Sequence, residues 1–165
     1  MPANGNSAIG ARPATRLREL GLVLPDPPMP LGDYVEASDT GNLLFLTGML
    51  PVVKGKLAIT GRLGESLSVE EGQKAARIAA LNALATAQHH LGDLDRLKKL
   101  VKLTVQLVTT EQFIDQAAVA DGASKLFVQI FGPGNGHTRV VYGVQSMPIG
   151  APVMIETIFA ICDPE

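Results

Sequence analysis

The stretch from Ser68 to Gly92 constrains the fold more than any other part of the sequence. Ser68 and Glu71 have the spacing of a capping box, in which each side chain accepts a hydrogen bond from the other residue's backbone N–H at the start of a helix. Apolar residues, most of them alanine, then recur at intervals of three and four residues, and Gly92 supplies the stop. The pattern predicts a long helix whose small apolar face packs closely against a sheet.

Strands are predicted on both sides of this helix. Val101–Leu107 alternates apolar and polar residues, which is typical of a strand with two different faces. A second helix is expected from about Gln112 to Phe131, although Gly122 weakens its centre. The order of elements predicts an α/β domain with a mixed sheet and two long helices packed on one face. The remaining expected strands are a hairpin over 33–47 with its turn at 39–41, a short strand at 57–59, and two final strands at 137–145 and 152–162.

The first 31 residues differ in character from the rest. Residues 1–11 are small, polar and rich in glycine, and we expect a mobile tail there. Pro13 opens a short helical stretch that Gly21 stops, and four prolines then force an extended connector. We therefore predict an N-terminal extension over 1–31 and one domain over 32–165.

Charge and composition exclude several classes of protein. Lys and Arg number 14 against 16 Asp and Glu, a net charge of -2, which argues against a nucleic-acid partner. A single cysteine, Cys162, excludes a disulfide framework. His89 and His90 are adjacent on the first long helix and His137 stands alone, so no metal site is expected. Without a membrane span or a signal peptide, we expect a cytoplasmic protein.

Arg139 is the charged residue that most needs a partner. It lies in a predicted strand whose other members are mainly apolar, and a guanidinium in such surroundings requires an anion. Two partners are open at this point: Glu156 on the next predicted strand, or the carboxylate of a bound ligand.

Three segments together resemble the RidA/YjgF family, also called endoribonuclease L-PSP-like, of which the chain looks like a divergent member. They are Gly32-Asp33-Tyr34, the stretch 41–51 from Gly41 to Pro51, and the stretch 139–156 from Arg139 to Glu156. The resemblance covers roughly residues 32–162. It implies a chorismate-mutase-like two-layer fold assembled as a homotrimer, in which three sheets surround a central barrel and ligand clefts lie between subunits. The polar side chains of Lys102, Thr104 and Gln106 would then face into the trimer.

The same resemblance implies an activity and a set of site residues. Typical members hydrolyse reactive enamines and imines, such as 2-aminoacrylate, to 2-oxo acids and ammonia, and need neither a metal nor an organic cofactor. Arg139 matches the arginine that grips the substrate carboxylate, and Tyr34 matches the tyrosine near the cleft mouth. Thr47 replaces the serine of a Ser-Gly motif and Gly48 keeps its glycine. Val141 stands where many members have a reactive cysteine.

The last strand departs from the family pattern. Met154 occupies the position of a glutamate thought to orient the attacking water, and a thioether cannot exchange a proton. Glu156 lies on the same face, about 6–7 Å farther along the strand. It is a candidate for the same role, although we favour its pairing with Arg139. The sequence therefore predicts a deaminase with Arg139 and Glu156 as catalytic residues or, as the alternative, a non-catalytic trimer that binds a small carboxylate metabolite.

Overall fold

The computed structural model describes residues 12–163. Residues 1–11, predicted to form a mobile tail, and residues 164–165 lie outside the described part. In chain order the elements are α1 (Pro13–Glu19), β1 (Ala37–Thr40), β2 (Leu43–Leu46), β3 (Val52–Val53), β4 (Lys56–Leu57), α2 (Val69–Leu91), the short 3-10 helix η1 (Leu94–Arg96), β5 (Leu97–Val108), α3 (Gln116–Phe131), β6 (Thr138–Val144), the 3-10 turn η2 (Pro148–Gly150) and β7 (Val153–Ile161).

Five strands form one mixed sheet in the order β1-β2-β7-β5-β6. Strands β5 and β6 are parallel, and every other neighbouring pair is antiparallel. Strands β3 and β4 pair separately from the main sheet. The topology leaves β1 and β6 as the two edges. Of the predicted site residues, Arg139 and Val141 lie on the edge strand β6.

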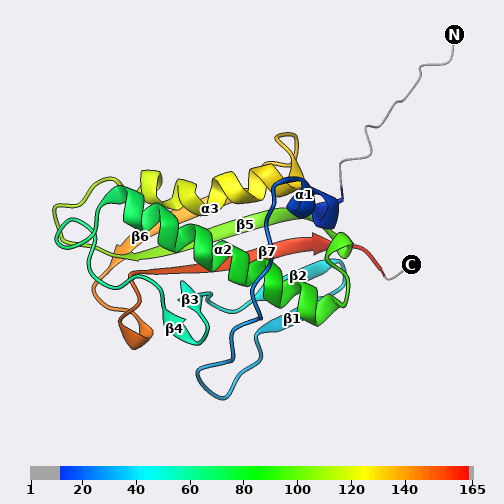
Figure 1. Ribbon diagram of the computed structural model, residues 1–165, viewed down its shortest axis with the longest axis horizontal. Coiled ribbons are helices and arrows are strands. Elements are labelled where there is room, and N and C mark those ends of the chain that lie inside the picture. Colours follow the sequence, from blue (N-terminus) through cyan, green and yellow to red (C-terminus); the bar gives the residue numbers. More distant parts are fainter. Residues whose placement is uncertain (1–11, 164–165) are drawn as a thin grey trace, which may run out of the picture.

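Helices α2 and α3 lie side by side over one face of the sheet, and α1 sits near the end of α3 (Figure 1). The core fills the space between these helices and the sheet. Leu17 of α1 is buried in the same core, although it belongs to the predicted N-terminal extension. The two-layer α/β architecture predicted from the sequence is therefore confirmed.

The predicted ends of α2 are confirmed in detail. The Ser68 hydroxyl accepts from the backbone N–H of Glu71 at 3.2 Å, and the Glu71 carboxylate accepts from the N–H of Ser68 at 2.8 Å. Gly92 ends the helix in the left-handed conformation, with φ of 76°. The alanine stripe is fully buried, and it faces α3 as well as the sheet.

The capping box is expected to contribute measurably to stability. Ser68→Ala removes the acceptor for the Glu71 N–H, and we expect a loss of about 1 kcal/mol in the free energy of unfolding. Urea denaturation at a fixed protein concentration would measure it. The matched control is Ser38→Ala on β1, where the serine is exposed, and its effect should stay within about 0.5 kcal/mol. Equal effects of the two substitutions would contradict the assignment.

Some predicted boundaries are wrong by a few residues. Helix α3 begins at Gln116 rather than Gln112, because residues 110–113 form a turn in which the Phe113 N–H bonds to the Thr110 carbonyl at 3.3 Å. The hairpin turn lies at Gly41 and Asn42 rather than at 39–41, since Thr40 already pairs with Leu43. The predicted strand 57–59 is reduced to β4.

The face of the sheet opposite the helices carries mixed side chains. Lys102, Thr104 and Gln106 of β5 point to this open face, as their alternation predicted, and Lys102 is exposed. Large apolar side chains also lie there with considerable exposure, including Phe45 at 40%, Val140 at 46% and Tyr142 at 43%. The open face of the sheet therefore exposes apolar side chains that contact with another surface could bury.

Candidate functional site

Arg139 lies on the edge strand β6, and its side chain points to the helix-covered face. Its Nη1 donates to Oδ1 of Asp121 at 2.7 Å and to Oγ of Ser124 at 3.0 Å, and its Nη2 donates to the Ala117 carbonyl at 3.4 Å. All three partners belong to α3. The Arg139 side chain keeps 25% of its surface exposed and that of Asp121 keeps 43%. The guanidinium is therefore fixed in place and still reaches the surface.

The predicted ion pair between Arg139 and Glu156 is wrong. Strand β5 lies between β6 and β7, so the two residues are not on neighbouring strands. Arg139 is opposite Leu103, whereas Glu156 is opposite Thr104. Because successive residues of a strand point to opposite faces, Arg139 lies on the helix-covered face and Glu156 on the open face. The anionic partner of Arg139 within the chain is Asp121.

Glu156 lies in a short polar row on the open face. The Gln106 side-chain amide is 3.4 Å from the Glu156 carboxylate and donates to the Tyr142 hydroxyl at 2.8 Å. Met154 is on the same face of β7, opposite Gln106. Glu156 itself is exposed, so its carboxylate remains accessible.

A second group of predicted residues gathers at the other side of the sheet. Tyr34 and Gly48 line a groove of about 680 Å³ together with the proline-rich connector. A Cβ added to Gly48 would overlap the sulfur of Met154, so Met154 packs directly over this glycine. Thr47, just after β2, donates its backbone N–H to the Glu36 carbonyl at 3.0 Å. Burial raises the pKa of the Glu36 carboxyl, which also lines the groove.

Within one chain these two groups do not meet. Three strand-to-strand steps separate β2 from β6, which is roughly 14 Å at the usual spacing. Val141 stands two residues beyond Arg139 on the same face and packs against the core. Arg139 and Val141 thus lie on the edge strand β6, whereas Tyr34 precedes β1 and Thr47 and Gly48 follow β2, on the other side of β7 and β5.

Three residues around Arg139 were not predicted as site residues: Asp121, Ser124 and His137. The Ser124 hydroxyl lies 3.0 Å from Nε2 of His137, and it also accepts the hydrogen bond from Arg139. Burial, and to a smaller extent the charge of Arg139, lowers the pKa of His137. Their spacing in the sequence could have indicated the cluster. Asp121 and Ser124 are three residues apart and so share one face of a helix, and His137 and Arg139 are two residues apart and so share one face of a strand.

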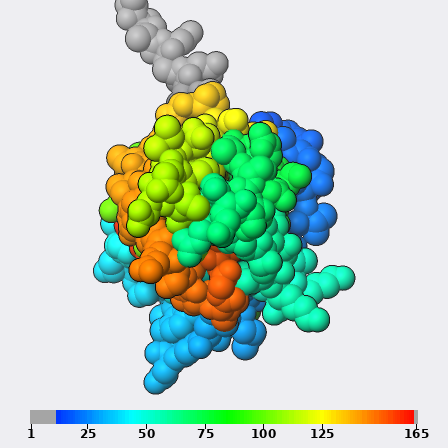
Figure 2. Space-filling view, turned by 90° about the vertical axis from the view of Figure 1, so that its left-hand side faces the viewer, coloured from blue at the N-terminus to red at the C-terminus, as the bar shows by residue number. Residues whose placement is uncertain are grey.

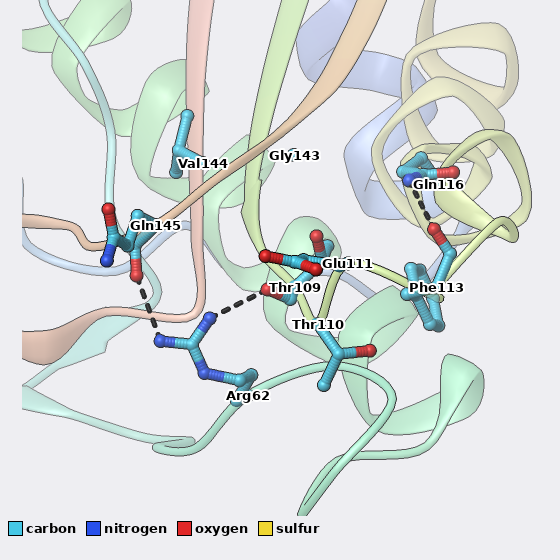
Figure 3. Close-up of a pocket in the computed structure, with 9 residues that line it drawn as sticks. All are labelled: Arg62, Thr109, Thr110, Glu111, Phe113, Gln116, Gly143, Val144 and Gln145. Carbon is cyan, nitrogen blue, oxygen red and sulfur yellow. Dashed lines mark hydrogen bonds between the residues drawn. The ribbon is translucent and has the colours of Figure 1, made fainter.

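A separate pocket of about 540 Å³ lies where β5 and β6 end. The segments that form it meet on the end of the molecule seen in Figure 2, with the residues after β6 in orange. Figure 3 shows the Arg62 guanidinium donating to the carbonyls of Thr109 at 2.7 Å and Gln145 at 2.9 Å. Arg62 therefore joins its own loop to the ends of both strands.

The described residues offer neither a metal centre nor a membrane-spanning helix. Within residues 12–163, no three His, Cys, Asp or Glu side chains come together in a group that could hold a metal ion. Over the same range, no helix combines the length and the apolar character that crossing a membrane requires.

Comparisons with known proteins agree with the fold. Residues 14–161 match the family model described as "YjgF/chorismate mutase-like, putative endoribonuclease". Protein TCP17 of Trypanosoma cruzi is 41% identical over 148 residues, covering 89% of this chain and 92% of that protein. The RutC family protein y4sK of Sinorhizobium fredii is 31% identical over 136 residues, covering 82% and 93%.

A solved structure supports the same relationship. The crystal structure of the protein Atu1372 from Agrobacterium tumefaciens, whose function is described as unknown, superposes with a TM-score of 0.83. Its sequence is 36% identical, and the match covers 91% of this chain and 92% of that one. The family match begins inside the segment predicted to be an N-terminal extension, where Leu17 joins the core. The resemblance found in the sequence is confirmed, and the chain belongs to the RidA/YjgF family of YjgF/chorismate mutase-like proteins.

Proposed function

We propose that this protein hydrolyses small carboxylated enamines and imines, such as 2-aminoacrylate, to 2-oxo acids and ammonia. The observation that carries the proposal is the fixed, partly exposed guanidinium of Arg139 at an edge of the sheet. Its Nη1 is engaged by Asp121 and Ser124, which leaves the Nε–H free of any hydrogen-bond partner among residues 12–163. A carboxylate approaching this side would form a charge-assisted contact in a defined orientation.

The remaining predicted residues would come from a neighbouring copy of the chain. The two edges of one sheet cannot meet within one protomer, but a ring of three copies brings β6 of one copy toward the opposite side of the next. We therefore place the cleft between subunits of a homotrimer, with Arg139 and Val141 on one wall. Tyr34, Thr47 and Gly48 would form the other wall. The half-apolar open face of the sheet supplies the surface that such an assembly would bury.

Met154 and Glu156 decide whether the cleft is catalytic. Met154 would line the cleft beside Gly48, where its thioether cannot move a proton. Glu156 is exposed and lies on the same face of β7, so we assign it the task of orienting the attacking water. The reaction as proposed draws on these protein groups alone, without a cofactor.

The test is to generate 2-aminoacrylate in the presence of the protein and follow the release of 2-oxo acid. Wild-type protein is expected to accelerate release over the spontaneous reaction. Glu156→Ala should lower kcat by about 10²-fold while the assembly stays intact, since positioned proton-handling groups contribute about that much. Met154→Glu is expected to raise the rate, because it adds a second carboxylate beside the first. Sedimentation of each variant checks the trimer.

A second function is favoured by Met154 itself. A trimer that only binds a small carboxylate metabolite needs Arg139 and a shaped cleft, and it tolerates a thioether where the family has a glutamate. In that case wild-type protein would not accelerate the reaction, Met154→Glu would gain activity, and calorimetry would show carboxylate binding that Arg139→Ala abolishes.

A further inference from the structure

The groove of about 680 Å³ is lined by the proline-rich connector, residues 24–31, and by the β3–β4 hairpin. In Figure 1 the connector, drawn in blue, descends to these two short strands. Most of the side chains that line the groove are apolar, among them Pro27, Pro28, Met29, Leu50 and Val52. Because the proline ring fixes φ, the wall that the connector forms is stiff. A preformed, mostly apolar groove of this volume is typical of a site for a small organic molecule.

Glu36 adds a carboxylate to this apolar lining. Its side chain is partly buried, and burial raises the pKa of its carboxyl without an opposing hydrogen bond or cation among residues 12–163. Asp26 and Lys54 line the same groove, but both are exposed, so water screens their charges. The three charges sum to -1. A cation that enters the groove would therefore be attracted to Glu36 and would stabilise its ionised form.

The ring of Tyr34 offers a second contact for a cation. Its hydroxyl accepts a hydrogen bond from the backbone N–H of Leu31 at 2.9 Å, and the ring edge lies against Gly32, 3.4 Å from where a Cβ would be. These contacts hold the ring in place while 45% of the residue stays exposed. The face of an aromatic ring attracts an ammonium group through its quadrupole. Tyr34 and Glu36 both line the groove, so one ligand can contact both.

Two residues with unfavourable backbone conformations line the same groove. Lys54 and Ile149 are the non-glycine residues with positive φ in the range 12–163, at 50° and 52°. This conformation is especially costly for a β-branched residue such as Ile149. The Ile149 side chain does not recover the cost in the core, because the residue is 57% exposed. Strained residues of this kind cluster at ligand sites, which supports a binding role for the groove.

We propose that this groove binds a small organic amine, an ammonium group attached to an apolar body about as large as a phenylethyl group. The ammonium group contacts the Glu36 carboxylate and the face of the Tyr34 ring. The apolar body lies along the prolines of the connector and Ile149. The inference goes beyond the proposed reaction and does not rest on it, although Tyr34 and Gly48 line the groove and also belong to the proposed cleft.

The deciding experiment is isothermal titration calorimetry of the full-length protein with 2-phenylethylamine and 2-phenylethanol. The two probes have the same shape and differ in the ammonium group, and neither has a carboxylate that Arg139 could bind. We expect the amine to bind about 10-fold more tightly than the alcohol or better, because its contact with Glu36 is charge-assisted. Glu36→Gln keeps the size of the side chain and should remove about 10-fold of the amine affinity. Tyr34→Leu should weaken the amine about 5-fold, whereas Tyr34→Phe keeps the ring and should stay within about 2-fold.

The matched control is Glu70→Gln, which changes an exposed glutamate of α2 outside the groove and should leave the amine affinity unchanged. Equal affinities for the two probes, an unchanged amine affinity in Glu36→Gln, or no binding of the amine at millimolar concentration would each overturn the proposal. Should Glu36→Gln not fold, the two probes compared on wild-type protein carry the same decision. Calorimetry requires no turnover, so the amine site and the proposed hydrolysis can fail independently of each other.

Discussion

Mixed trimers of two inactive variants, Arg139→Ala and Gly48→Leu, are expected to recover activity. Neither variant is expected to be active alone. Arg139→Ala removes the carboxylate anchor on one wall of the proposed cleft. Gly48→Leu alters the other wall: Gly48 does not adopt a positive φ, so a side chain is allowed by the backbone, but even a Cβ there displaces Met154. The leucine and the displaced thioether would then fill the cleft.

The size of the recovery follows from symmetry. In a ring of three identical contacts, each cleft pairs the β6 wall of one subunit with the other wall of the next. A mixed trimer of either composition has one cleft in which both walls are unaltered. Co-expression with two different affinity tags, followed by purification on both, leaves only mixed trimers, so about one third of wild-type activity is expected.

The matched control uses two lesions on the same wall. Arg139→Ala mixed with Arg139→Glu gives no intact cleft in any trimer, and activity should remain at background. Full activity of either parent variant alone, or no recovery in the mixed trimers, would remove the basis for a cleft shared between subunits.

The sequence predicted the elements whose signals are local. The ends of α2 were predictable because a capping box and a terminal glycine act within a few residues of the helix. Alternation in β5 placed Lys102, Thr104 and Gln106 on one face without any knowledge of their neighbours. The start of α3 was not predictable in the same way. Phe113 fits the apolar period of the helix, but its side chain packs against the Gly64 loop instead.

The partner of Arg139 could not be predicted from the sequence, because it depends on the order of the strands in the sheet. Strands β6 and β7 follow one another in the chain, and Glu156 was therefore expected beside Arg139. In the structure β5 lies between them, and the register places Arg139 opposite Leu103 and Glu156 opposite Thr104. Because Leu103 and Thr104 are successive residues, the two side chains lie on opposite faces. Asp121 takes the place of Glu156 because α3 crosses the helix-covered face beside β6.

Gly122 illustrates how a residue can have opposite effects locally and in the fold. Within an isolated helix, Gly→Ala stabilises by about 1 kcal/mol, and Gly122 was expected only to weaken the centre of α3. In the structure α3 is continuous, and Gly122 faces the backbone of α2. A Cβ on Gly122 would overlap the carbonyl oxygen of Gln73 and lie 2.7 Å from its carbonyl carbon. A backbone carbonyl cannot rotate away as a side chain can.

Gly122→Ala is therefore expected to destabilise the protein, against its helix propensity, by about 3 kcal/mol, because α2 and α3 must separate. In a domain of this size that lowers Tm by roughly 6–12 °C, measured by thermal unfolding at a fixed protein concentration. The matched control is Gly134→Ala, since a Cβ there meets no atom within 4 Å and the backbone φ is not positive. Its effect should stay within about 0.5 kcal/mol. A Gly122→Ala protein as stable as wild type would mean that the two helices do not approach this closely.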